Sequence, residues 1–187
     1  MIPVKEQNVA SYIAALASTA AVPGGGSAAA LAAAMGVALV SMVAKISAKK
    51  AKQDSDRAAL MALVPGLDQL CERLMDLSQQ DVNAYRAVIE TKKTGGGPAE
   101  IERAYERAAE VPLVAAAAAS EGLAMAAEVS KHAWEMTASD LAVGTELLET
   151  GMHGALGNVA INLPELKGEA AARVERRYRE LRAAADP

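Results

Sequence analysis

The sequence carries no charged residue between Gln7 and Ala44, and this stretch limits what the chain can fold into. Its second half, from Ser27 onward, is rich in alanine with only scattered Leu, Val and Met. A segment of this length and composition either crosses a membrane or lies buried between other helices. Alanine contributes little to membrane insertion, and Lys5 beside Glu6 is not the basic start of a secretory signal. We therefore expect a buried, closely packed helix, no membrane partner and a cytoplasmic location.

The composition of the whole chain indicates an all-α fold. The chain has 187 residues with no Phe, one Trp and four Tyr, so the aromatic residues that favour strands are scarce. The abundant alanine favours helices, and the length suits one domain. A net charge of −4 argues against nucleic acid as a partner, while one Cys and two His argue against a disulfide framework or a zinc site. We predict one helical domain over residues 1–187 that binds no metal.

Glycine and proline positions divide the chain into successive helical spans. The expected helices cover residues 4–20, 27–48, 54–90, 98–129, 139–163 and 164–185. Pro65 and Pro112 fall inside the third and fourth spans, where a proline removes a backbone hydrogen bond and bends the helix. The predicted architecture is a single-domain bundle of long, partly kinked helices.

The third span contains a leucine seam with alternating spacings of three and four residues, which is typical of a buried helix face. Its members are Leu60, Leu63, Leu67, Leu70, Leu74 and Leu77. The next seam position is Asp81, followed by Ala84 and Val88, so the pattern points a carboxylate inward. Desolvating a charge is costly, so an inward carboxylate needs a partner or a cavity. Asp81 is therefore either a buried cap or ion-pair residue, or the general base of a site.

Glycine and asparagine recur along one face of the fifth span. Gly144, Gly151 and Asn158 are spaced by sevens, and Asn162 follows one turn later. Glycine inside a helix costs about 1 kcal/mol relative to alanine, which close helix packing or a ligand against the backbone can offset. The asparagine amides donate and accept hydrogen bonds, which suits a heterocycle as well as a partner helix. Asp140 precedes this face and is either a site residue or a first-turn acid favoured by the helix dipole.

A glycine-rich turn, Pro-Gly-Gly-Gly-Ser at residues 23–27, leads into the second span. Free backbone amides there can bind an anion, and Ser27 is placed to cap the helix. The turn lacks the Lys-Ser/Thr of a phosphate-binding loop and the glycine spacing of a dinucleotide fingerprint, so capping alone is the simpler interpretation. Lys49 and Lys50, at the other end of this span, either steer an anionic ligand or only complement the helix dipole.

Taken together, these segments resemble the cyclodeaminase/cyclohydrolase family of folate enzymes, which includes formimidoyltetrahydrofolate cyclodeaminases and methenyltetrahydrofolate cyclohydrolases. The resemblance rests on six blocks that follow the family order over nearly the whole chain. The blocks are Pro23–Ala44, Lys49–Lys50, Asp81–Tyr85, Val111–Leu113, Ser139–Asp140 and Asn158–Leu163. Residues 92–97 and 133–137 depart from the family pattern.

The resemblance implies a helical enzyme, usually a homodimer, that acts on a tetrahydrofolate whose one-carbon unit bridges N5 and N10, with no further cofactor. It implies that Asp81 is the catalytic carboxylate. The residues that it places at the substrate are Gly24, Gly25, Gly26, Ser27, Asp140, Asn158 and Asn162. Further candidates for substrate binding, from the matched blocks, are Lys49 and Lys50, which could steer the anionic tail of folate, and Tyr85. The sequence leaves open whether the reaction is that of a cyclohydrolase or a cyclodeaminase. The alternative is a non-catalytic or diverged helical dimer that binds another small molecule or a protein partner.

Overall fold

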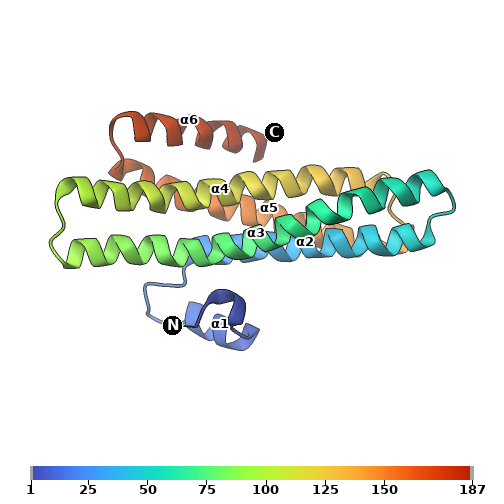
Figure 1. Ribbon diagram of the computed structural model, residues 1–187, viewed down its shortest axis with the longest axis horizontal. Coiled ribbons are helices and arrows are strands. Elements are labelled where there is room, and N and C mark those ends of the chain that lie inside the picture. The colour runs from blue at the N-terminus through green and yellow to red at the C-terminus, as the bar shows by residue number, and fades with distance from the viewer. Residues whose placement is uncertain (1, 186–187) are drawn as a thin grey trace.

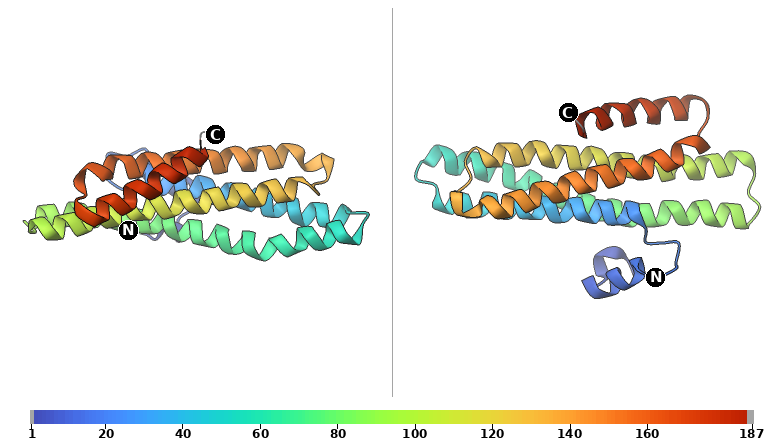
Figure 2. Two further views of the ribbon diagram at one scale, coloured as in Figure 1. Left: turned by 90° about the horizontal axis from the view of Figure 1, so that it is seen from above. Right: turned by 180° about the vertical axis from the view of Figure 1, so that it is seen from behind.

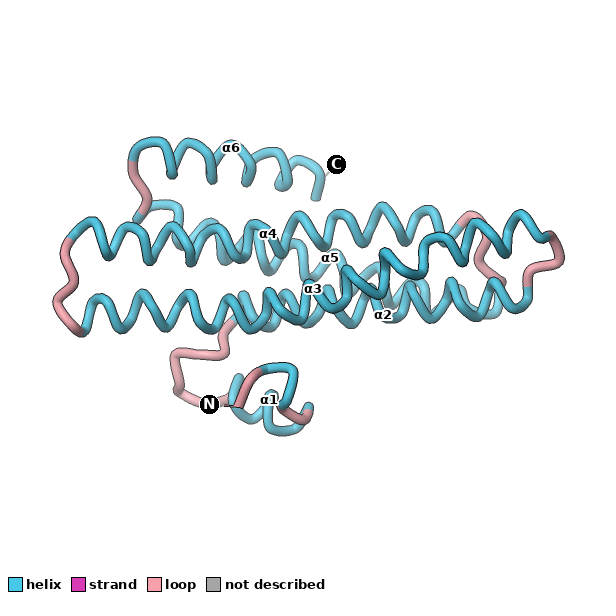
Figure 3. Tube along the Cα trace, viewed as in Figure 1, coloured by secondary structure: helices cyan, strands magenta, loops and turns pink. Residues whose placement is uncertain are grey.

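Four long helices run alongside one another and form the body of the protein in a computed structural model that describes residues 2–185 (Figure 1). They are α2 (Gly25–Lys50), α3 (Asp54–Lys93), α4 (Pro98–Ser130) and α5 (Ala138–Asn162). Two shorter helices, α1 (Val9–Leu16) and α6 (Gly168–Ala185), lie on opposite sides of this bundle. Short 3-10 helices occur at Val4–Glu6, Glu135–Thr137 and Leu163–Glu165. Residues 2–185 contain no strand, and loops only join helix ends (Figure 3), so the predicted all-α bundle is confirmed.

The helix boundaries differ from prediction mainly at the two ends of the chain. The helix expected over residues 4–20 is instead a 3-10 turn followed by α1. The side chain of Asn8 accepts a hydrogen bond from the backbone N–H of Ser11 and so starts α1 separately. At the other end, Pro164 lies in a 3-10 helix, and α6 begins only at Gly168, whose φ is +55°.

Both internal prolines lie within continuous helices, as predicted. Pro65 lies inside α3 and Pro112 inside α4. The long α3 changes direction along its length in Figure 1. A proline leaves the helix connected but removes one backbone donor, which permits such bending.

The charge-free helix α2 occupies the centre of the bundle and packs against α3, α4 and α5. Its residues Val37, Val40 and Val43 are completely buried. By length and composition alone both α2 and α4 could cross a membrane, and 61% of the most apolar part of α2 is buried inside the bundle. The buried, closely packed helix expected from the missing charges is therefore what the fold contains.

The glycines of α5 allow close contact with α2, which crosses behind it in the rear view of Figure 2. A Cβ atom on Gly144 would lie 3.1 Å from the carbonyl oxygen of Gly36, and one on Gly151 would lie 2.8 Å from that of Ala29. Helix packing therefore explains both glycines. The same contact brings the end of α5 beside the start of α2.

Candidate active site

A cavity of about 190 Å³ lies where the start of α2, the second half of α3 and the end of α5 meet. Its lining includes most of the residues predicted at the site: Gly24, Gly25, Gly26, Asp81, Tyr85, Asn158 and Asn162. The remaining lining residues are Ala21, Val22, Ala108 and Ile161. The fold thus brings together four segments that are far apart in the sequence.

Asp81 points into this cavity, as the leucine seam of α3 predicted. Burial raises the pKa of the Asp81 carboxyl from 3.8 to about 6, and the neighbouring backbone N–H of Ser27 partly opposes this rise. The carboxyl is then mostly ionised at neutral pH but is easily protonated. This is the property needed of a group that takes up a proton and returns it during one reaction.

The glycine-rich turn is what allows α2 to approach this carboxyl. A Cβ atom on Gly26 would lie only 2.2 Å from Oδ1 of Asp81, and one on Gly25 would lie 3.3 Å from Nδ2 of Asn158. No side chain larger than glycine fits at position 26 unless Asp81 moves. The cap residue of α2 is Gly24, without a side-chain hydrogen bond, so the prediction that Ser27 caps this helix is wrong.

Ser27 lies behind the cavity and is completely buried. Its Oγ is 2.8 Å from the hydroxyl of Tyr12 and 2.7 Å from Oγ of Ser78. Ser78 also donates to the carbonyl oxygen of Ser27 at 3.0 Å. These bonds fasten the first turn of α2 to α1 and α3, so Ser27 supports the cavity wall and does not line it.

Three residues at or behind the cavity, Tyr12, Ser78 and Ile161, were not among those predicted from the sequence. Ser78 precedes Asp81 by three residues and so shares its helix face, which is a signal that could have been used. Tyr12 reaches the site only through the position of α1 against the bundle. Ile161 is 70% exposed and lies between the two predicted asparagines in the block Asn158–Leu163, which is a signal that could have been used.

The two asparagines of α5 differ in what they can offer a ligand. Nδ2 of Asn162 donates to the carbonyl oxygens of Ala108 and Asn158 at 3.0 and 2.9 Å. Both of its N–H donors are therefore used within the protein, and only its oxygen can serve a ligand. Nδ2 of Asn158 donates to the carbonyl oxygen of Gly154 at 2.8 Å and retains a second donor.

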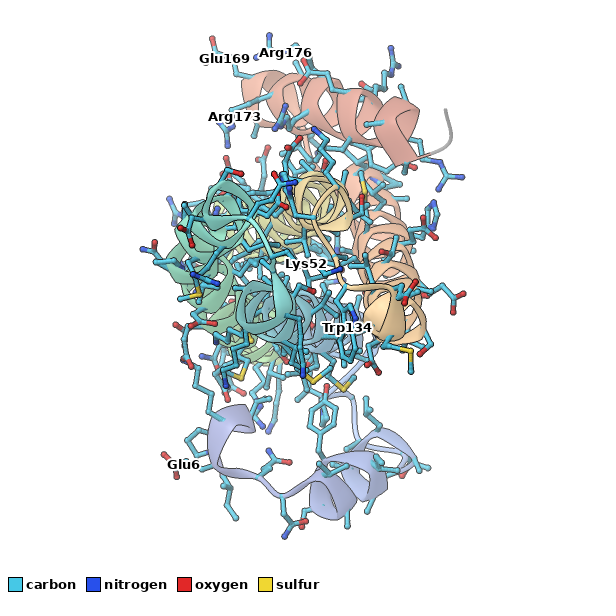
Figure 4. All side chains as sticks on the ribbon, turned by 90° about the vertical axis from the view of Figure 1, so that its right-hand side faces the viewer. Glu6, Lys52, Trp134, Glu169, Arg173 and Arg176 are labelled. Atoms are coloured by element: carbon cyan, nitrogen blue, oxygen red, sulfur yellow. The ribbon has the colours of Figure 1, made fainter. Side chains whose placement is uncertain are left out.

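The remaining predicted residues lie at the opposite end of the bundle. Lys49 and Lys50 end α2, whereas the cavity lies at its start, about 36 Å away along the helix axis. Asp140 lies in the first turn of α5, at the same end as Lys50, whose Nζ is 5.2 Å from the ring of Trp134. Figure 4 looks onto this end, with Trp134 in front. Within one chain these three residues do not line the cavity that contains Asp81.

The cavity offers space for a small ring next to a carboxyl group that can carry a proton. Between residues 2 and 185, no group of three or more His, Cys, Asp or Glu side chains is placed to hold a metal ion. Gly24, Gly25 and Gly26 line the cavity at the start of α2, where the first N–H groups of a helix have no partner within it, and Asn158 contributes a side-chain amide. This arrangement suits proton transfer on a bound heterocycle.

Known proteins resemble this chain over most of its length. Residues 8–180 match the family described as formiminotransferase-cyclodeaminase. A formimidoyltransferase-cyclodeaminase from Dictyostelium discoideum is 32% identical over 88% of this chain. A methenyltetrahydrofolate cyclohydrolase from Methylorubrum extorquens is 31% identical over 94% of this chain and 87% of its own length.

The chain spans 31% of the length of the formimidoyltransferase-cyclodeaminases from Dictyostelium discoideum, Gallus gallus and Mus musculus. The crystal structure of formiminotetrahydrofolate cyclodeaminase from Thermotoga maritima has the same fold, with a TM-score of 0.91 at 23% identity. The match covers 98% of this chain and 92% of that one.

Proposed function

Because the chain belongs to the formiminotransferase-cyclodeaminase family, we propose that it acts on the carbon that bridges N5 and N10 of tetrahydrofolate, with Asp81 as general acid and base. The observation that carries this proposal is the partly buried Asp81 carboxyl in the cavity, with its pKa raised to about 6. A cavity beside this group that also presents the side chains of Tyr85, Asn158 and Asn162 favours an enzyme over a helical dimer without catalytic activity. The family resemblance also leads us to propose a homodimer, and we propose a cytoplasmic location.

In the cyclohydrolase reaction, water attacks the electrophilic methenyl carbon of 5,10-methenyltetrahydrofolate. Ionised Asp81 accepts a proton from the attacking water, and a C–O bond forms. The bond from this carbon to N5 then breaks, and protonated Asp81 returns the proton to the departing nitrogen. The product is 10-formyltetrahydrofolate, and one proton is released overall. The Methylorubrum extorquens relative, which the chain matches over 87% of its length, supports this reaction.

In the cyclodeaminase reaction, N10 of 5-formiminotetrahydrofolate attacks the formimino carbon instead. The formimino group reacts in its protonated, amidinium form, and attack by N10 forms a C–N10 bond. Asp81 takes the proton that N10 loses and delivers it to the amino group; the bond from the carbon to this group then breaks, which gives ammonia and the 5,10-methenyltetrahydrofolate cation. Both reactions pass through a tetrahedral carbon beside the same carboxyl. The cyclodeaminase relatives among the matched proteins support this second assignment.

Turnover of the two substrates tests the proposed function and distinguishes the cyclohydrolase reaction from the cyclodeaminase reaction. We expect the purified protein to remove the bridge absorbance of 5,10-methenyltetrahydrofolate faster than buffer does, or to release ammonia from 5-formiminotetrahydrofolate. The first result assigns the cyclohydrolase and the second the cyclodeaminase. If the protein consumes neither substrate, the proposed function is wrong.

A further inference from the structure

The cavity is too small to enclose a whole folate, which matters if the proposed function holds. Its volume of about 190 Å³ is below the roughly 300 Å³ at which pockets for drug-sized ligands begin. The bicyclic ring and the bridging carbon fill such a space. The aromatic amide and the glutamate, which carries two carboxylates, must then lie outside the cavity on the protein surface.

One face of α3 leads out of the cavity. Asp81, Tyr85 and Lys92 are separated by four and seven residues, so they lie along one side of the helix. Val88, on the same side, is 3% exposed and belongs to the core, so Tyr85 and Lys92 form the accessible surface beyond the cavity. By helix geometry Tyr85 lies about 6 Å and Lys92 about 16 Å beyond Asp81 along the axis. Tyr85 lines the cavity and is still 42% exposed, so its ring is accessible at the opening. Ile161 from α5 lines the same cavity and is 70% exposed.

Lys92 holds a positive charge at the end of this face. Its Nζ is 2.6 Å from the hydroxyl of Tyr105 and 4.8 Å from the centre of that ring. The hydrogen bond to Tyr105 raises the pKa of Lys92, and the negative charge of Glu165 acts in the same direction. An ammonium group has three donors, so the bond to Tyr105 leaves two for a carboxylate, for which Glu165 is the nearby competitor.

We infer that this face of α3 binds the tail of the folate, with Tyr85 and Ile161 against its aromatic ring and Lys92 against its glutamate carboxylates. The inference rests on the proposed function. Along α3 the order of acid, aromatic ring and cation matches the order of bridging carbon, aromatic ring and carboxylate in the ligand. Lys49 and Lys50, which the sequence suggested for steering, lie at the far end of the bundle.

Binding measurements with a Lys92→Ala variant test this inference. The matched control is Lys93→Ala, which removes the same charge from the next residue, about 100° around the helix. Calorimetry is performed with 5-formyltetrahydrofolate and with 6-methyltetrahydropterin, which lacks the aromatic amide and glutamate. We expect Lys92→Ala to weaken folate binding about three- to tenfold at low salt, less at high salt, and to leave pterin binding unchanged.

The control and a second variant complete the test. Lys93→Ala should bind both ligands like the wild type. Tyr85→Ser should weaken folate binding about two- to tenfold and pterin binding less, because Tyr85 lines the cavity and is also exposed at its opening. Equal effects of Lys92→Ala and Lys93→Ala on folate, or an equal loss for folate and pterin, would overturn the tail site. If the wild type binds neither ligand, the proposed function fails together with the inference.

Discussion

Replacement of Asp81 by Asn should lower turnover of the folate substrate by about 10²- to 10⁴-fold while the fold is kept. Asparagine has nearly the same shape and can still accept a hydrogen bond from the backbone N–H of Ser27. Its amide cannot take up the proton that water or N10 must lose. Steady-state turnover, with circular dichroism as the control for folding, measures the effect.

The same variant should be more stable than the wild type above pH 6. The carboxyl of Asp81 has a pKa of about 6 in the folded protein and 3.8 when exposed, so its ionisation opposes folding as the pH rises. The stabilisation of the folded state is fully present below pH 3.8 and is lost as the pH rises through 6. This difference between the two pKa values corresponds to at most about 3 kcal/mol in the free energy of unfolding. Thermal unfolding at pH 8 and pH 4 should show Asp81→Asn stabilised only at pH 8.

If Asp81→Asn instead loses both stability and activity at pH 8, the carboxyl group stabilises the fold. This result would assign Asp81 a structural role as a buried hydrogen-bond or ion-pair residue. Near-normal turnover by Asp81→Asn would remove Asp81 from the mechanism altogether.

Replacement of Gly26 by Ala should reduce turnover by about 10²-fold. The added Cβ would lie 2.2 Å from Oδ1, 2.6 Å from Cγ and 2.9 Å from Oδ2 of Asp81, so the carboxyl group must move. A displacement of about 1 Å of a reacting group can cost that much in rate. The structural cost should be smaller, because a flexible side chain and not backbone is displaced. Turnover and thermal unfolding measured on the same preparation separate the two effects.

Gly24→Ala is the matched comparison for this variant. A Cβ on Gly24 would have its nearest neighbour, the carbonyl oxygen of Ala21, at 3.9 Å, which is an ordinary contact. Gly24→Ala should therefore reduce turnover much less than Gly26→Ala does. Equal activity of the two variants would show that contact between α2 and Asp81 does not set the position of the carboxyl.

The periodicity of the sequence was sufficient to predict the local part of the site. The leucine seam of α3 placed Asp81 on an inward face, because residue spacing determines the face of a helix. The family resemblance placed the glycine-rich turn in the same site as Asp81, and the three glycines and Asp81 line one cavity, although capping was the simpler interpretation. The structure explains why position 26 is glycine: a Cβ atom there would collide with the carboxyl group of Asp81.

Spacing alone could not show at which end of the bundle a residue lies. Lys49, Lys50 and Asp140 belong to family blocks, yet α2 and α5 place them far from the cavity within one chain. The hydrogen bond between Tyr12 and Ser27 could not be predicted either, because it depends on how α1 packs against the bundle. Such tertiary contacts leave no periodic pattern in the sequence.

Titration of the Asp81 carboxyl by carbon-13 NMR tests the central claim most directly. The resonance is identified by its absence from the spectrum of Asp81→Asn, and it is followed with and without 5-formyltetrahydrofolate. The site described here predicts a midpoint near pH 6 in the free protein that shifts when the folate binds. A midpoint near pH 4 that the folate leaves unchanged would contradict it.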